Sequence, residues 1–249
     1  MTTVSRSIEI PVQNEEIDGT FLAPIDKLPG VLFIHGWGSE QKGDIARAKG
    51  VASLGCVCLT FDLRGHARTK SRLDVVSRDD NYRDVVAAYD MLARHPNVDP
   101  DAIAVVGSSY GGYLAAILTS HRAVKWLALQ VPALYRDEHW RQPKGQINRE
   151  DLTAYRQTFV TPDDNRALRS CRDFKGDVLI VESEFDSFVP HPAIMSYRAA
   201  FQHTHSLTHR IIDGADHALS LDVYQEAYTR ILLNWATEMV MGARIQNMR

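Results

Sequence analysis

Two adjacent serines stand inside a glycine frame in the stretch AVVGSSYGGYLAA, residues 104–116. An apolar run precedes this frame and an alanine-rich run follows it, so a strand must give way to a helix within about three residues. The sequence Gly107-Ser108-Ser109-Tyr110-Gly111 fits the G-x-S-x-G pattern of a nucleophile elbow, with Ser109 at its apex and Ser108 at the variable position. An ordinary strand-to-helix turn built from Gly and Ser would fit the same short pattern.

A base and a carboxylate for such a serine occur further along the chain. A serine hydroxyl is a weak nucleophile at neutral pH and needs a base within hydrogen-bond reach. His217 is the candidate base, because it follows a short predicted strand at 209–212 and a loop that contains a glycine. Asp186 follows the apolar run 177–183 and is the candidate that would orient the imidazole. The rival carboxylates that stay open are Glu182, Glu184, Asp213 and Asp216.

Backbone N–H groups that could hold a developing oxyanion are also predicted. The run His35-Gly36-Trp37-Gly38 directly follows an apolar segment, and its glycines predict a loop beside the elbow. We predict that the N–H groups of Trp37 and Tyr110 form the oxyanion hole, because a helix leaves its first N–H groups unpaired. The sequence shows no metal-ligand spacing, and Gly36 and Gly38 do not continue into a dinucleotide fingerprint. We therefore expect no metal and no organic cofactor.

Short apolar runs rich in Val, Ile and Leu alternate with segments of helical period. This alternation predicts an α/β fold with βαβ units and a mostly parallel sheet that helices cover on both faces. The runs expected to form its strands are 30–36, 56–62, 102–107, 124–131 and 177–183. Helices are expected over 81–96 and 221–241. Residues 5–24 alternate and include a turn signal at Asp18-Gly19, which predicts an antiparallel hairpin at the sheet edge.

Composition limits the class of protein. A chain of 249 residues with 45% hydrophobic content can form one α/β domain or two small ones, and we favour a single domain over 1–249. The net charge of −3 offers no basic surface for nucleic acid or an anionic membrane. We find neither a signal-peptide pattern nor a membrane-spanning run, so we expect a cytoplasmic protein. Cys56, Cys58 and Cys171 are expected to be reduced, buried thiols.

Residues 133–172 break the alternation of strands and helices. They are polar and charged with scattered aromatic side chains, and the segment is longer than a simple crossover helix needs. We predict that this segment is a cap insertion. Two ordinary surface helices without substrate contact would fit the same composition.

The motifs HGWG, GSSYGG, FDSFVP and GADH make the sequence resemble the α/β-hydrolase fold family, in the style of small esterases, dienelactone hydrolases and serine aminopeptidases. The resemblance extends over about residues 30–235 and includes the chain order of serine, acid and histidine. It implies a central, mainly parallel sheet of about eight strands flanked by helices. It also implies a triad of Ser109, His217 and Asp186 under a variable cap.

A further motif of that family, FDLRGH, ends at His66. The resemblance implies that Asp62, Arg64 and His66 have structural roles in shaping the loop after a strand. The next two residues are Ala67 and Arg68, where the family commonly has a glycine and a small polar residue. This departure leaves the path of the loop open and does not affect the triad.

The expected activity is that of a serine hydrolase that cleaves carboxylic esters with small to medium acyl or aryl groups through an acyl-enzyme on Ser109. Esters are favoured because the pocket beside the elbow must be apolar and nothing obvious recognises a charged amine. An aminopeptidase-like peptidase or a thioesterase on the same triad stays open, as does a binding protein of this fold without turnover. The expected partner is a small-molecule acyl substrate, with no nucleic acid and no membrane. A homo-oligomer also stays open.

Overall fold

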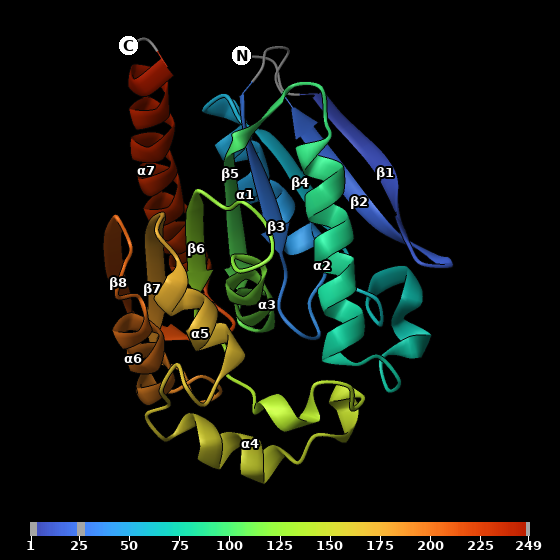
Figure 1. The fold of residues 1–249 in the computed structure, drawn as a ribbon, viewed down its shortest axis with the longest axis vertical. Helices are drawn as coiled ribbons and strands as arrows, with labels where there is room; N and C mark the ends of the chain where they lie inside the picture. Colours follow the sequence, from blue (N-terminus) through green and yellow to red (C-terminus); the bar gives the residue numbers. More distant parts are fainter. Residues whose placement is uncertain (1–3, 24–27, 248–249) are drawn as a thin grey trace.

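The computed structural model describes residues 4–23 and 28–247. These residues contain an eight-stranded sheet in the order β1-β2-β4-β3-β5-β6-β7-β8. β2 pairs antiparallel with both β1 and β4, and the remaining neighbours are parallel. The strands are β1 (Val4–Val12), β2 (Glu15–Ala23), β3 (Leu28–Ile34), β4 (Val57–Phe61), β5 (Val98–Ser108), β6 (Trp126–Gln130), β7 (Asp177–Phe185) and β8 (Ser206–Asp216). The predicted mainly parallel sheet is confirmed (Figure 1).

Helices cover both faces of the sheet (Figure 1). Because both faces are covered, every residue of β4 and β6 is buried, which explains their continuous apolar runs VCLTF and WLALQ. One face carries α1 (Lys42–Ser53) and α7 (Asp222–Asn247). The other face carries α2 (Arg78–Ala93), α3 (Tyr110–Leu118), α5 (Arg166–Asp173) and α6 (His191–Ala200).

The N-terminal hairpin is present, but the turn predicted at Asp18–Gly19 is wrong. The connection between β1 and β2 lies at Gln13–Asn14, where Gln13 takes a φ of 58°. Gly19 lies inside β2, and a Cβ placed on it would come within 3.0 Å of the Ile10 side chain. The glycine therefore makes room for a neighbouring side chain in the sheet, and does not mark a turn.

The part of segment 133–172 that carries the 3-10 helices and α4 (Arg149–Arg156) lies beyond the ends of the parallel strands, at the bottom of Figure 1, whereas α5 packs beside α3 on the sheet. Arg156 fastens this segment, since its guanidinium donates to the carbonyl oxygens of Leu134 and Phe188, each at 3.0 Å. Ala133, at the start of the segment, donates its N–H to the carbonyl of Ser109 at 3.0 Å. The segment comprises the 3-10 helices η2 (Asp137–His139) and η3 (Lys144–Gln146), then α4 and α5.

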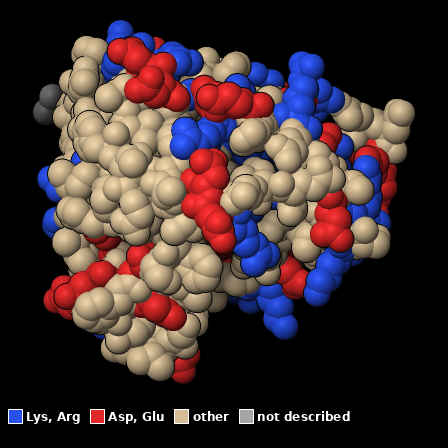
Figure 2. Space-filling model, turned by 90° about the horizontal axis from the view of Figure 1, so that it is seen from below, with Lys and Arg blue, Asp and Glu red and all other residues tan. Residues whose placement is uncertain are grey.

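The polar composition of this segment is explained in part by ion pairs. Arg136 contacts Asp151 and Arg166 contacts Asp137, with N–O distances of 3.2 and 3.1 Å. Viewed from below, basic and acidic side chains are intermixed over the surface and neither sign gathers into one broad area (Figure 2).

Two further expectations concern membranes and thiols. None of the helices in the described ranges is long and apolar enough to cross a membrane. Cys56, Cys58 and Cys171 are buried, as expected. Burial raises the pKa of the Cys58 and Cys171 thiols, so both act as packing groups that stay protonated.

Candidate active site

Ser109 lies between β5 and α3, where the backbone is strained. It takes a φ of 51° and a ψ of −109°, which residues with a Cβ rarely adopt. Its N–H donates to the carbonyl of Gln130 at 2.8 Å, and its own carbonyl accepts from the N–H groups of Tyr113 and Ala133 at 3.1 and 3.0 Å. These three hydrogen bonds hold the apex in its strained conformation.

Two glycines allow the backbones around Ser109 to approach closely. A Cβ on Gly107 would lie 2.6 Å from the carbonyl oxygen of Gly111. A Cβ on Gly111 would overlap the carbonyl oxygen of Ile34 at the end of β3 and lie 2.6 Å from that of His35. Real Cβ atoms essentially never make contacts this short. The glycines of the G-x-S-x-G pattern therefore let α3 begin directly behind Ser109 and against β3.

His217 and Asp186 meet Ser109 although they lie far away in the sequence. Nε2 of His217 lies 3.0 Å from the Ser109 Oγ, and Nδ1 lies 2.6 Å from Oδ2 of Asp186. An ionised carboxylate only accepts hydrogen bonds, so Nδ1 donates to Asp186 and Nε2 is left to accept from the Ser109 hydroxyl. Oδ1 of Asp186 accepts from the N–H groups of Phe188 and Val189, both at 2.8 Å. The Asp186 side chain is only 2% exposed, so its orientation is fixed.

The four rival carboxylates have other surroundings. Glu182 is buried and accepts from two histidine rings at 2.6 and 3.0 Å, neither of which is His217. Glu184 accepts from a backbone N–H of β8 at 2.7 Å. Hydrogen bonds from Ser220 lower the pKa of Asp216, and Asp213 is exposed. Asp186 is thus the carboxylate that the structure brings to the imidazole.

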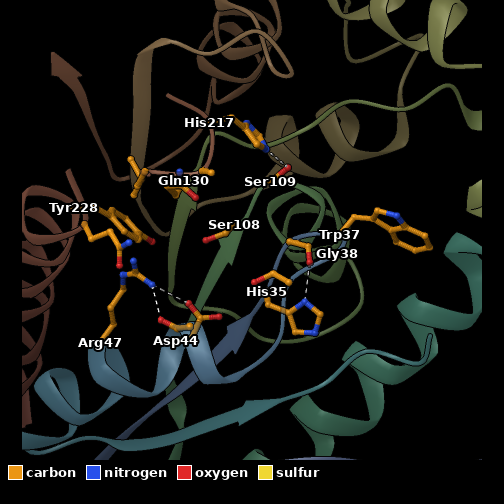
Figure 3. A pocket seen from close by; sticks show the side chains of 16 residues that line it. His35, Trp37, Gly38, Asp44, Arg47, Ser108, Ser109, Gln130, His217 and Tyr228 are labelled. Carbon is orange, nitrogen blue, oxygen red and sulfur yellow. Dashed lines mark hydrogen bonds and ion pairs between the residues drawn. The ribbon is translucent and has the colours of Figure 1, made fainter. Parts of the chain in front are cut away.

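The loop after β3 lies directly against the elbow. A Cβ on Gly36 would lie 3.4 Å from the Cβ of Ser109, so the two backbones are nearly in contact. Tyr110 is the first residue of α3, and its N–H therefore lies outside the helical hydrogen-bond ladder. The loop that carries Trp37 and the first residue of α3, Tyr110, thus both adjoin Ser109. The Trp37 side chain points away from the cavity beside Ser109 (Figure 3).

His66 holds the loop after β3 by a hydrogen bond. Its Nε2 accepts from the N–H of Gly38 at 3.0 Å, and its Nδ1 donates to the carbonyl of Arg64 at 3.2 Å. Burial lowers the pKa of His66, so the ring stays neutral at pH 7 and keeps Nε2 as an acceptor. Asp62 accepts from the backbone and side-chain N–H groups of Gln41 at 2.8 and 2.9 Å. These contacts agree with the structural roles that the family resemblance implies.

Arg64 ties the same loop to α2. Its Nε donates to Oδ1 of Asp84 at 2.5 Å, its backbone N–H donates to Oδ2 at 2.8 Å, and both side chains are buried. Removing Arg64 would leave the buried Asp84 carboxylate without its cation, which costs about 3–5 kcal/mol. Ala67 takes a φ of 43°, so the loop keeps a left-handed turn where the family commonly has a glycine.

A cavity of about 410 Å³ lies beside Ser109, on the side of α1 and α7 (Figure 3). Its lining includes residues of the HGWG and GSSYGG motifs, but the polar residues that α1, β6 and α7 contribute belong to no motif. One signal was available: Asp44 lies on the buried stripe of α1 together with Ala48, Val51 and Ala52, where an apolar residue is expected. The polar lining residues missed by sequence analysis are Ser39, Asp44, Arg47, Gln130, Gln225 and Tyr228.

A lysine borders the other side of the elbow. Nζ of Lys144, in η3, lies 3.8 Å from the centroid of the Trp37 ring and 5.1 and 5.4 Å from those of Tyr110 and Tyr135. Burial lowers the pKa of Lys144. Cation–π contacts shielded from water contribute about 2 kcal/mol. Segment 133–172 therefore contacts the loop after β3 through the Lys144 ammonium on the Trp37 ring.

The sheet, the elbow and the flanking helices define a serine hydrolase with the α/β-hydrolase fold. Residues 43–242 match the prolyl oligopeptidase family, and the chain belongs to that family. A search of curated proteins found no match.

Several solved structures share the fold at low sequence identity. A dienelactone hydrolase from Anabaena variabilis is 18% identical with a TM-score of 0.66, over 94% of this chain and 96% of that chain. An esterase from Pyrococcus furiosus is 16% identical with a TM-score of 0.72, over 96% and 92%. An acylaminoacyl peptidase from Pyrococcus horikoshii is 16% identical with a TM-score of 0.70, over 94% and 41%. This chain therefore spans less than half the length of that peptidase.

The elbow glycines predict a specific loss of stability. Because a Cβ on Gly111 would overlap the Ile34 carbonyl, we expect Gly111→Ala to lower the free energy of unfolding by about 2 kcal/mol or more, measured by urea denaturation. Gly242→Ala is the control, since a Cβ there meets no atom within 4 Å, and it should raise stability by up to about 1 kcal/mol. Equal effects of the two variants would contradict the close approach described here.

Asp44 predicts a dependence of stability on pH. Burial raises its pKa to about 6, and the nearby Arg47 opposes this rise only in part. Between about pH 4 and 6 the unfolded chain loses this proton more readily than the folded chain. Relative to Asp44→Asn, the wild type should therefore lose on the order of 2–3 kcal/mol as the pH rises from 4 to 7. Urea denaturation at several pH values measures the difference, and a constant difference would contradict this burial.

Proposed function

We propose that this serine hydrolase cleaves carboxylic esters with small to medium acyl or aryl groups through an acyl-enzyme on Ser109. The observation that carries the proposal is the 3.0 Å contact between the Ser109 Oγ and Nε2 of His217. A base at this distance makes a serine hydroxyl nucleophilic at neutral pH. The bond from Nδ1 to Asp186 supports the tautomer that this role needs.

The proposed reaction has two halves. Oγ of Ser109 attacks the acyl carbonyl carbon while Nε2 of His217 takes the hydroxyl proton, and Asp186 stabilises the imidazolium. The N–H groups of Trp37 and Tyr110 donate to the oxyanion of the tetrahedral intermediate. The leaving group departs with the proton from Nε2. A water molecule then attacks the acyl-enzyme with the same base, which releases the carboxylic acid and restores Ser109.

We also propose that residues 133–172 act as a cap within a single domain over 1–249. The contact of Lys144 with the Trp37 ring and the hydrogen bond from Ala133 to the Ser109 carbonyl support this role. A cytoplasmic location is a further proposal, supported by three buried thiols in place of a disulfide framework.

A peptidase is the second candidate function. The family match and the likeness to an acylaminoacyl peptidase favour it. The ester proposal is supported by coverage, since this chain spans 96% of the dienelactone hydrolase and 92% of the esterase but 41% of the peptidase.

Substrate choice separates these two candidates. We expect short p-nitrophenyl esters to be turned over with a higher kcat/KM than aminoacyl p-nitroanilides. Part of this difference is intrinsic, because the leaving phenolate needs no protonation whereas an anilide must be protonated. The rate for each substrate is therefore divided by the uncatalysed rate of hydrolysis of the same substrate, and these enhancements are compared. An enhancement over that rate that is larger for the anilides would favour the peptidase, and hydrolysis confined to thioesters would favour a thioesterase.

The proposed nucleophile predicts labelling and turnover of defined variants. A fluorophosphonate probe should label the wild type and Ser108→Ala but not Ser109→Ala, because only Ser109 lies beside the base. His217→Ala and Asp186→Asn should each lower p-nitrophenyl ester turnover by about 10³-fold or more.

Glu184→Gln is the control for the carboxylate, since Glu184 bonds a backbone N–H of β8 and should leave turnover nearly unchanged. A Glu184→Gln variant as impaired as Asp186→Asn would refute the assignment of Asp186. Absence of labelling in the wild type would instead favour a binding protein without turnover.

A further inference from the structure

In the cavity beside Ser109, one edge of the Arg47 guanidinium has no hydrogen-bond partner among the described residues. Nη1 of Arg47 donates to the carbonyl of Gly43 at 2.8 Å and to Oδ1 of Asp44 at 3.4 Å. Nε of Arg47 is buried and has no hydrogen-bond partner among the described residues, and Nη2 makes no hydrogen bond to them either. The side chain is only 13% exposed and Nε is fully covered, so water does not satisfy Nε, whereas Nη2 is not fully covered.

The free edge has a defined chemical preference. The N–H groups of Nε and Nη2 point in the same direction from one edge of the planar guanidinium. Such an edge donates two parallel hydrogen bonds to a carboxylate. The Arg47 Cζ lies 4.9 Å from the centroid of the Tyr228 ring, and the bonds of Nη1 fix the other edge. The group is therefore held in place, and its Nε–Nη2 edge stays unpaired among the described residues.

Other donors border the same space. The Tyr228 hydroxyl is buried, and although it faces Ser108, no hydrogen bond of normal geometry joins them. Gln130 is buried at the end of β6 and lines the cavity with Ser108 and Ser109 (Figure 3). Among the lining side chains one is a guanidinium and one is a carboxylate, that of Asp44. A single cation, partly offset by Asp44, matches a monoanion better than a doubly charged group.

We propose that this cavity binds a carboxylate carried by the substrate, with Arg47 as the residue that determines this specificity. This inference deepens the proposed function and rests on it, because the bound carboxylate would belong to a molecule whose ester group reaches Ser109. Gln130 and Tyr228 supply further donors to the carboxylate oxygens. Asp44 occupies Nη1 of Arg47 at 3.4 Å, which leaves Nε and Nη2 for the carboxylate of the substrate.

The test uses two substrates that differ by one charge, mono-p-nitrophenyl adipate and its methyl ester. The measured quantity is the ratio of kcat/KM for the acid to kcat/KM for the methyl ester. We expect Arg47→Gln to lower this ratio at least ~10-fold, since paired hydrogen bonds to a charged group are lost. Arg94→Gln is the matched control, because the Arg94 side chain is 81% exposed and does not line the cavity. A smaller fall, or an equal fall in the control, overturns the proposal.

Two additions keep the result interpretable. Arg47→Gln leaves Asp44 without its cation, so the double variant Asp44→Asn/Arg47→Gln removes both charges and must show the same direction of change. Binding of monomethyl adipate and dimethyl adipate to Ser109→Ala, followed by calorimetry, reports on the cavity without turnover. Tighter binding of the monoanion, lost with Arg47→Gln, supports the carboxylate site even if the wild type fails to cleave esters. Equal binding of the two compounds overturns it even if esters are cleaved.

Discussion

The backbone conformation at Ser109 is the constraint on which the site depends. A positive φ at a residue with a Cβ costs about 1–3 kcal/mol and persists only where the surroundings enforce it. Here three backbone hydrogen bonds hold Ser109, and every residue of α3 behind it is buried. Gly107 and Gly111 bring β5, α3 and the end of β3 into backbone contact. The serine hydroxyl, the loop of Trp37 and the start of α3 are therefore positioned by one packing arrangement.

Buried polar groups then fix the loops around this arrangement. Arg64 and Asp84 form a buried ion pair between the loop after β4 and α2, and a neutral His66 accepts from the N–H of Gly38. Such groups are costly to bury unless each is satisfied, so the loops have few alternative conformations. The same logic applies to Asp186, whose carboxylate receives two backbone N–H groups as well as His217. The charges at the site are thus held by the fold before any substrate arrives.

Features that follow from local pattern were predictable from the sequence. The strands, the elbow at Ser109 and the order of Ser109, Asp186 and His217 each leave a short motif or a continuous apolar run. The turn at Gln13–Asn14 was missed because Gly19 looked like a turn residue, whereas it serves the packing of Ile10. The polar cavity lining was missed because its residues converge only after folding. Asp44 on an apolar stripe was the one local sign. The roles of the triad and of segment 133–172 stay predictions.

Different kinds of side chain lie on the two sides of Ser109. Toward segment 133–172 the wall is aromatic and closed by the ammonium of Lys144, whereas toward α1 and α7 it is a polar chamber around Arg47. The polar chamber is lined by α1, α7, the ends of β5 and β6, the elbow at Ser109 and the loops after β3 and β8, and segment 133–172 contributes none of its lining. Evolution could therefore exchange residues 137–156 of the outer segment, which lie beyond the strand ends, and leave the chamber intact, or redesign the chamber helix by helix without disturbing how those residues are seated.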